Sequence, residues 1–261
     1  MPLTLATWNV NSLKVRLPHL LDWLATHRVD IVCLQETKLV DELFPVAPLA
    51  EAGYAAVFTG QKTYNGVALL TRRDTVPPAS DVVTALPGFD DPQKRLIAAN
   101  VGALRVACAY FPNGQAVGSD KYDYKLRWIG ALDHWLRGEV TRHPLLALAG
   151  DFNIAPEDRD VHDPKAWEGQ VLFSEPEKQS FRRLVDIGFV DSFRMFEQPE
   201  RSYTWWDYRM LAFRRKMGLR IDHVLLSKAL AARCTACTID VEPRRREQPS
   251  DHAPVIVTLD V

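Results

Sequence analysis

Short apolar runs recur along the whole chain, and polar segments separate them. Runs of this length that are rich in aliphatic and aromatic residues are typical of buried β-strands. We predict strands at residues 3–8, 31–34, 54–59, 67–71, 96–100, 104–110, 145–149, 223–226, 234–241 and 255–259.

Apolar residues at helical spacing predict helices in segments 16–24 and 122–140, and a short third helix near 181–185. Segment 158–175 is polar and lacks periodicity, which predicts a surface loop. Many strands at short spacing with helices between them favour an α+β sandwich over a parallel βαβ sheet. Because no linker or low-complexity tract interrupts this pattern, we predict one domain over residues 1–261.

Two polar side chains follow the most apolar of these strands. Asp151 and Asn153 come directly after the run that ends at Ala149, and an unpaired buried carboxylate is costly. Residues two apart on an extended chain point to the same side, and Gly150 is expected to let the backbone turn where the strand stops. Together they could bind a metal ion or orient a water molecule.

Other predicted strands also end in polar residues with metal or phosphate chemistry. Each alone could be a turn former or an ordinary solvent-facing residue. Together they predict a shared polar site at one end of a sheet system. We expect His252 to contact Asp222, which would orient the imidazole, and we expect His223 to point away. The residues are Asn9, Asn11, Glu36, Tyr110, Asp222, Asp251 and His252.

Composition narrows the class of protein. The 261 residues are 47% hydrophobic and 25% charged, as in ordinary globular proteins, and no run approaches a membrane span. The chain start lacks a secretory signal pattern and four cysteines make no disulfide scaffold, so we expect a cytoplasmic protein without a membrane partner. A net charge of −1 gives no overall attraction to nucleic acid, although 214–216 and 244–246 are local basic clusters.

The polar segments resemble the exonuclease III branch of the endonuclease/exonuclease/phosphatase superfamily, which repairs abasic DNA. The matching segments follow the family's order over nearly the whole chain, and their combination is more specific than any one of them. They are Thr7-Trp8-Asn9-Val10-Asn11, Leu34-Gln35-Glu36-Thr37-Lys38, Tyr64-Asn65-Gly66-Val67-Ala68, Gly150-Asp151-Phe152-Asn153, Trp205-Trp206-Asp207-Tyr208-Arg209, Leu219-Arg220-Ile221-Asp222 and Ser250-Asp251-His252-Ala253-Pro254.

This resemblance implies a four-layered α/β sandwich, in which two facing mixed β-sheets are flanked by helices. It also implies Glu36 as the main ligand of Mg²⁺ or Mn²⁺, and a predicted metal set of Asn9, Glu36, Asp151, Asn153 and Asp251. Asn11 stands where some family members carry an aspartate, which leaves one or two metal ions open.

The same resemblance implies the catalytic roles. Asp151 would activate the attacking water, and Asn153 would hold that water or the phosphate. His252, oriented by Asp222, would bind the scissile phosphate and stabilise its developing charge. Tyr110 would hydrogen-bond the phosphate and assist the leaving oxygen.

The resemblance implies a substrate surface as well. Lys62, Tyr64 and Asn65 would touch the phosphate backbone, and an apolar pocket would accept a flipped, baseless sugar beside a basic segment. Aromatic residues in the protein core are the alternative interpretation of the tryptophans. The pocket and its surroundings would comprise Trp205, Trp206, Leu219, Arg220 and Ile221.

The expected function is hydrolysis of duplex DNA 5′ to abasic sites by a monomer, with 3′→5′ exonuclease and 3′-phosphatase activity on 3′-blocked lesions. Three alternatives remain open at this point. The protein could be mainly a 3′→5′ exonuclease, or a phosphatase acting on a small phosphate ester, or a non-catalytic nucleic-acid-binding regulator. Segment 158–178 matches the family poorly and could border the substrate groove.

Overall fold

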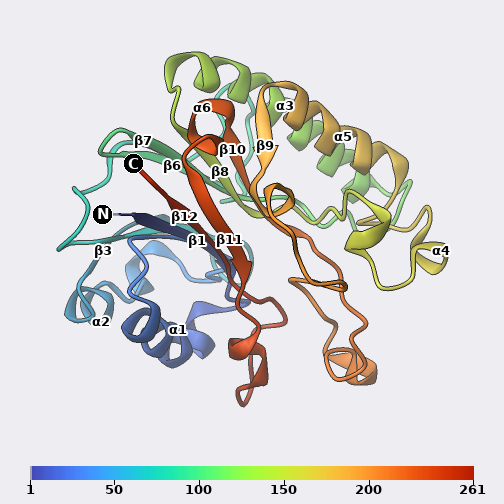
Figure 1. Ribbon diagram of the computed structural model, residues 1–261, viewed down its shortest axis with the longest axis horizontal. Coiled ribbons are helices and arrows are strands. Elements are labelled where there is room, and N and C mark those ends of the chain that lie inside the picture. The colour runs from blue at the N-terminus through green and yellow to red at the C-terminus, as the bar shows by residue number, and fades with distance from the viewer. Residues whose placement is uncertain (1) are drawn as a thin grey trace.

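Two six-stranded β-sheets lie face to face in the computed structural model, which describes residues 2–261 (Figure 1). Sheet A consists, in spatial order, of β11 (Cys234–Ile239), β12 (Val255–Leu259), β1 (Leu3–Asn9), β2 (Ile31–Gln35), β4 (Val67–Arg72) and β3 (Tyr54–Thr59). Sheet B consists of β5 (Ser80–Val83), β6 (Leu96–Val101), β7 (Leu104–Tyr110), β8 (Leu146–Asp151), β10 (Asp222–Ser227) and β9 (Phe189–Asp191). Both sheets are mixed, because β1–β2 and β7–β8 are parallel neighbours.

Helices cover the outer faces of both sheets. α1 and α2 lie on sheet A, and α3 and α5 lie side by side on sheet B (Figure 1). This arrangement confirms the predicted four-layered α/β sandwich. The helices are α1 (Leu13–His27), α2 (Val46–Glu51), α3 (Asp120–Arg142), α4 (Pro164–Trp167), α5 (Glu175–Asp186) and α6 (Lys228–Ala231). Among the described residues, none of them is both long and apolar enough to cross a membrane.

Strand β8 shows why the sequences of the central strands are continuous apolar runs. Ala147 and Ala149 face the space between the sheets, whereas Leu146 and Leu148 pack against the α3 and α5 layer. Both faces of the strand are therefore buried, and neither needs a polar residue.

The structure corrects two local expectations. β8 continues through Gly150 to Asp151, so this glycine does not end the strand. A Cβ atom at Gly150 would lie 1.8 Å from the Ala109 carbonyl oxygen, so the position needs glycine for its close contact with β7. The predicted loop at 158–175 also contains a 3₁₀ turn at 158–160 and the short helix α4.

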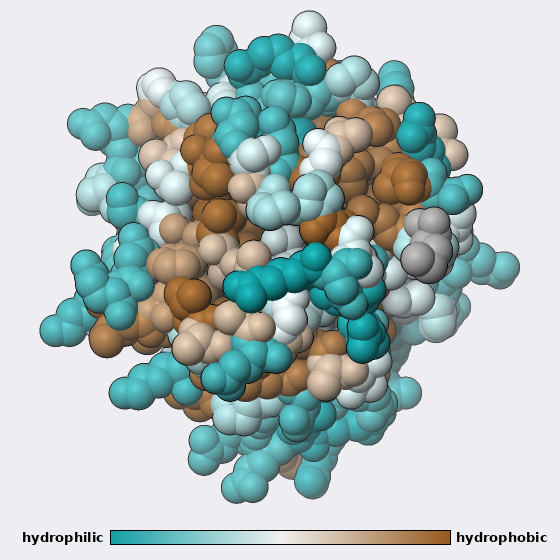
Figure 2. All heavy atoms as spheres, turned by 90° about the vertical axis from the view of Figure 1, so that its left-hand side faces the viewer, coloured by the Kyte–Doolittle hydropathy of each residue, from teal (hydrophilic) through white to brown (hydrophobic). Residues whose placement is uncertain are grey.

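The chain termini mark the end of the sheets that is remote from the predicted site. β1 begins and β12 ends at the left of Figure 1. Viewed from that side, apolar patches alternate with polar residues (Figure 2). The strand ends that carry the predicted site residues lie at the opposite end.

Candidate active site

The residues predicted from the strand ends gather at one edge of the two sheets. β1 and β2 are parallel, so Asn9 and the residue after Gln35, Glu36, lie at neighbouring carboxyl ends. In sheet B, Tyr110 at the end of β7 is in register with Asp151 at the end of β8. The antiparallel β10 begins at the same edge, and its first residue, Asp222, is also in register with Asp151.

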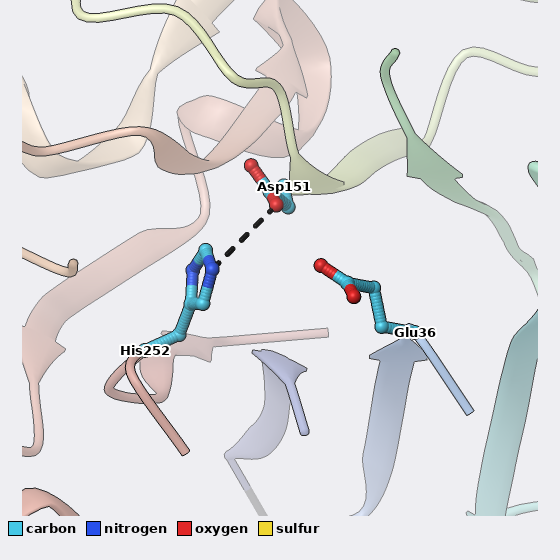
Figure 3. Close-up of side chains that lie close together, drawn as sticks. All are labelled: Glu36, Asp151 and His252. Atoms are coloured by element: carbon cyan, nitrogen blue, oxygen red, sulfur yellow. Dashed lines mark ion pairs between the residues drawn. The ribbon is translucent and has the colours of Figure 1, made fainter. Parts of the chain in front are cut away.

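Glu36, Asp151 and His252, here called the central cluster, form the middle of the site. Each offers a ligand atom, and these atoms lie within 4.8 Å of one another. Asp151 and His252 point toward each other with Glu36 beside them, and His252 Nε2 is 3.8 Å from Asp151 Oδ2 (Figure 3). The Asn9 amide donates to Glu36 Oε1 at 2.8 Å and to Asp151 Oδ2 at 2.9 Å, which links sheet A to sheet B.

The donor set of the central cluster fits a metal ion. Its two carboxylates, Glu36 and Asp151, can bind a divalent cation, since Mg²⁺ needs only one or two carboxylates because it keeps several waters. Asn9 turns its oxygen away, since Asn9 Oδ1 accepts from the Asn11 backbone N–H at 2.9 Å. In this arrangement Asn9 donates to the carboxylates and does not offer an oxygen to the cluster.

Asp251 lies outside the central cluster. Its Oδ1 accepts from Asn11 Nδ2 at 2.8 Å, and its Oδ2 accepts from Trp205 Nε1 at 2.9 Å. Lys38 Nζ contacts both Asn11 Oδ1, at 2.6 Å, and Glu36 Oε2, at 2.8 Å. Asn11 and Lys38 therefore connect Asp251 to Glu36. Lys38 received no role from the sequence, although it ends the Gln35-Glu36-Thr37-Lys38 segment.

Asp222 orients His252, as expected. His252 Nδ1 and Asp222 Oδ2 are 2.8 Å apart, and both residues are buried. Burial alone would lower the pKa of His252, but the carboxylates of Asp222, Asp151 and Asp251 raise it to about 10. His252 is therefore an imidazolium at neutral pH. His223 points away, as predicted: its Nε2 contacts the Ile154 carbonyl at 2.8 Å.

Asp151 has a pKa near neutrality. Burial raises the pKa of this carboxyl, His252 and Asn9 lower it, Asp222 and Glu36 raise it, and the result is about 7. A general base works best when its pKa lies near the working pH. Asp151 therefore has the protonation behaviour that the predicted water-activating base requires.

Asn153 is held beside Asp151 by a turn and not by an extended chain. Its φ of 50° lies in the left-handed region, and its N–H donates to Asp151 Oδ1 at 2.9 Å. Its amide nitrogen donates to the Phe111 carbonyl at 3.0 Å, and its Oδ1 accepts from Asn113 Nδ2 at 3.1 Å. Asn113 was not predicted from the sequence, although Pro112-Asn113-Gly114 follows the strand that ends at Tyr110.

Tyr110 faces the central cluster from β7. Burial raises the pKa of its hydroxyl well above the usual range, and the carboxylates of Glu36 and Asp151 add to this effect. The Arg95 guanidinium lies over the Tyr110 ring at 4.8 Å from its centroid. The hydroxyl thus keeps its proton at neutral pH and can donate a hydrogen bond. Arg95 was another residue that the sequence analysis did not find.

Comparison with known proteins identifies the group to which this arrangement belongs. The profile of the Endonuclease/Exonuclease/phosphatase family matches residues 6–252. The chain belongs to this family. It is 35% identical to exodeoxyribonuclease III of Haemophilus influenzae, over 95% of this chain and 97% of the relative. The similarity places it in the exonuclease III branch of DNA repair nucleases.

Two solved structures are similar over almost their whole length. One is the 3′ phosphatase NExo from Neisseria bound to a product DNA hairpin, with 47% identity, a TM-score of 0.96 and coverage of 99% of this chain and 100% of that chain. The other is an AP endonuclease from Archaeoglobus fulgidus, with 38% identity, a TM-score of 0.94 and the same coverage. Both support the exonuclease III type of sandwich for this nuclease.

Of the predicted backbone-contacting residues of the nuclease, Tyr64 and Asn65 lie beside Tyr110. Lys62 and Tyr64 are exposed, whereas Asn65 is buried and donates to the side-chain oxygens of Gln61 and Gln93. Tyr64 and Asn65 line a pocket of about 690 Å³ together with Tyr110, Arg95 and Asn113.

The predicted sugar pocket is only partly assembled from the expected residues. Trp205 lines a pocket of about 380 Å³ whose walls include His162, Trp167, Met210 and Met217. Leu219 and Ile221 are buried behind Trp205. Trp206 belongs to a separate buried cluster, where its ring centroid lies 5.1 Å from that of Phe213.

Arg220 is buried, although the family resemblance implies that it contacts the substrate. Its side chain is 1% exposed, and it pairs with Asp160 at 2.6 Å and with Asp191 at 2.8 Å. The guanidinium joins β10 to the 158–160 turn and to the end of β9. A buried guanidinium with two carboxylate partners has no free donor for a phosphate, so we reassign Arg220 to a structural role.

Proposed function

We propose that the protein is a Mg²⁺-dependent nuclease that hydrolyses the backbone of duplex DNA 5′ to abasic sites, with Mn²⁺ as an alternative metal. We propose the same chemistry for 3′-blocked ends, because each reaction breaks a bond between phosphorus and a 3′-oxygen and leaves a 3′-hydroxyl group. The observation that carries this proposal is the central cluster, with ligand atoms within 4.8 Å at the edge of two sheets.

Glu36 would be the main ligand of the metal, since carboxylate oxygens are the ligands that Mg²⁺ prefers. When bound, the ion would neutralise charge on the phosphoryl oxygens. Asp151, with a pKa of about 7, would accept the proton of the attacking water. Asn153 lies against Asp151 and would hold that water or a phosphate oxygen through its amide group.

His252 and Tyr110 would act on the phosphate. The imidazolium of His252 faces the space between the carboxylates and would stabilise the negative charge that develops on the phosphoryl oxygens. Tyr110 keeps its proton and would donate a hydrogen bond to the phosphate or to the leaving 3′-oxygen. Asp222 would fix the imidazole in the orientation that presents Nε2 to the substrate.

The surroundings support duplex DNA as the substrate, and we propose that a monomer binds it. The Trp205 pocket lies next to the catalytic residues, because Trp205 pairs with His252 through a β-bridge and donates to Asp251. A flipped deoxyribose without its base is small enough for a pocket of about 380 Å³. Exposed basic residues at 214–216 follow this segment and could contact phosphates, which a small phosphate ester would not require.

A second candidate is an enzyme that acts mainly on 3′ ends. The observation that favours it is the 47% identity to the Neisseria protein, which is described as a 3′ phosphatase and, in another structure, as a 3′–5′ exonuclease. The catalytic residues would be the same in both cases. The candidates differ in whether the abasic nucleotide must enter the Trp205 pocket within a continuous strand.

Three labelled duplexes separate these activities. One carries a central abasic analogue, one ends in a 3′-phosphate, and one is undamaged with a recessed 3′ end. We expect a single cut 5′ to the abasic analogue with Mg²⁺ and no cut in EDTA. Loss of phosphate from the second duplex without cleavage of the first would favour the 3′-end enzyme. Tight binding without any hydrolysis would overturn both.

A further inference from the structure

A buried ion pair lies beneath the loops that carry Asn113 and Asn153. Lys125 in α3 and Glu177 in α5 contact each other, and both side chains are 0% exposed. The Lys125 ammonium also donates to the Asn153 carbonyl at 2.7 Å and to the Asn113 carbonyl at 3.2 Å. A lysine ammonium has three donors, so the carboxylate and the two carbonyls use all of them.

Glu177 is fixed from its own side. Its Oε1 accepts from the Leu172 N–H at 3.0 Å, and its Oε2 accepts from the Ser174 N–H at 3.0 Å. Glu177 and Ser174 form the capping box at the start of α5. The position of the carboxylate is therefore set by the helix start, and the carboxylate in turn sets the position of Lys125.

Stability does not explain why these charges are buried. Replacing a buried ion pair by hydrophobic residues of similar volume is often neutral or stabilising, because the charges no longer have to be removed from water. What hydrophobic residues cannot supply is a donor to the carbonyls of Asn113 and Asn153. These carbonyls belong to residues whose side chains face the active site.

The contacts of Lys125 with these two carbonyls also affect the surroundings of Asp151. Asn153 has a left-handed backbone, a conformation that asparagine adopts more readily than most residues other than glycine. Its N–H donates to Asp151 Oδ1, and its side chain is hydrogen-bonded to that of Asn113. A cation that fixes the carbonyls of both asparagines therefore fixes their amide groups relative to Asp151.

We propose that Lys125, held by Glu177, is a positioning residue that keeps Asn113 and Asn153 in register with Asp151. Neither member of the pair touches the reacting phosphate, and both act through the two asparagines. This inference rests on the proposed function of Asp151 and Asn153 in phosphodiester hydrolysis.

The test compares two buried ion pairs on the same helix. The double variant Lys125→Met/Glu177→Gln removes the positioning pair without leaving a lone charge. The control is Arg105→Met/Glu139→Gln, which removes the pair between β7 and the far end of α3, where both side chains are 2% exposed. Each variant is measured for unfolding in urea, for binding of the abasic duplex in EDTA, and for single-turnover cleavage in Mg²⁺.

We expect the Lys125→Met/Glu177→Gln variant to bind DNA within about threefold of wild type and to cleave it about 10- to 100-fold more slowly, because small displacements of catalytic groups have effects of this size. The control variant is expected to cleave within about twofold of wild type at any temperature where it is folded. The single variant Lys125→Arg keeps the charge and is expected to recover most of the rate.

The outcomes separate this inference from the proposed function. If the wild-type protein does not cleave the abasic duplex or the 3′-phosphate, the proposed function is wrong. If it cleaves either, and the Lys125→Met/Glu177→Gln variant is no slower than the control, only the positioning role is wrong. If the double variant does not fold, the comparison of Lys125→Arg with Lys125→Gln decides: equal rates would refute a role for the charge at Lys125.

Discussion

The charge of Asp222 should determine the pH range in which the enzyme works. Asp222→Asn keeps an oxygen that can accept from His252 Nδ1, so the orientation of the ring is retained while the charge is removed. Nδ1 and Oδ2 are 2.8 Å apart and both residues are almost fully buried. Two unit charges about 4 Å apart at an effective dielectric constant of about 20 interact by about 4 kcal/mol.

That energy converts into a shift in pKa. About 4 kcal/mol corresponds to about three pKa units, since one unit is about 1.4 kcal/mol. The pKa of His252 is about 10 in the wild-type protein. It should therefore fall to about 7 in Asp222→Asn, and the imidazolium fraction at pH 9 should fall from about nine tenths to about one hundredth.

The assay is single-turnover cleavage of an abasic duplex between pH 6 and pH 9.5, with the His252 ring titrated in parallel by NMR. We expect Asp222→Asn to lose up to about 100-fold in rate at pH 9 and less than about 10-fold at pH 6, where both proteins carry the imidazolium. Asp240→Asn is the matched control, because Asp240 pairs with His27 at 3.1 Å outside the active site. A pH–rate profile of Asp222→Asn parallel to that of wild type would refute the reasoning.

Three further substitutions test other parts of the structure. Asp151→Asn should lower the cleavage rate by about 10²- to 10⁴-fold while DNA binding in EDTA is retained, and a rate near wild type would exclude Asp151 as the base. Glu36→Gln should raise the Mg²⁺ concentration needed for half-maximal rate, measured by titration with the metal. An unchanged Mg²⁺ concentration for half-maximal rate would show that Glu36 is not the main metal ligand. Arg220→Met should lower the free energy of unfolding in urea by about 3–5 kcal/mol, because Asp160 and Asp191 would stay buried without their cation. Unchanged stability would show that these carboxylates do not depend on Arg220.

The titration of His252 and Asp151 also makes the stability of the folded protein depend on pH. The folded-state pKa of His252 is raised from 6.5 to about 10, so its contribution to stability is complete below about pH 6.5 and is lost as the pH rises toward 10. The folded-state pKa of Asp151 is raised from 3.8 to about 7, so burial of this group costs stability as the pH rises from about 4 to 7. Both contributions therefore fall as the pH rises, that of Asp151 between about pH 4 and 7 and that of His252 between about pH 6.5 and 10.

Local sequence pattern was sufficient for most strands and for the residues at their ends, but it did not predict the short edge strands β5 and β9. Glu36 and Asp151 each follow an apolar run, and a polar residue there has to find a partner or solvent. The parallel pair β1–β2 then places Glu36 next to Asn9 in sheet A, and the parallel pair β7–β8 places Asp151 next to Tyr110 in sheet B. The layering of the two sheets came from family resemblance, since periodicity does not specify which sheets face each other.

The roles of the remaining residues could not be predicted because they depend on contacts between segments that are distant in the sequence. Arg220 lies close to a basic cluster in the sequence, but it pairs in the protein interior with Asp160, which is 60 residues away. Trp205 and Trp206 are neighbours that enter different clusters, because adjacent residues in this irregular segment point in opposite directions. Lys125 lies on an ordinary amphipathic helix, and its partner Glu177 lies 52 residues further along the chain.

The most direct test of metal-assisted attack by water at phosphorus is cleavage of the abasic duplex in water enriched in ¹⁸O. With Mg²⁺ present, we expect one ¹⁸O atom in the new 5′-phosphate and an unlabelled 3′-hydroxyl group on the other fragment. Products that contain no ¹⁸O and end in an unsaturated 3′ sugar would contradict this mechanism, because they would indicate elimination at the sugar instead of hydrolysis at phosphorus.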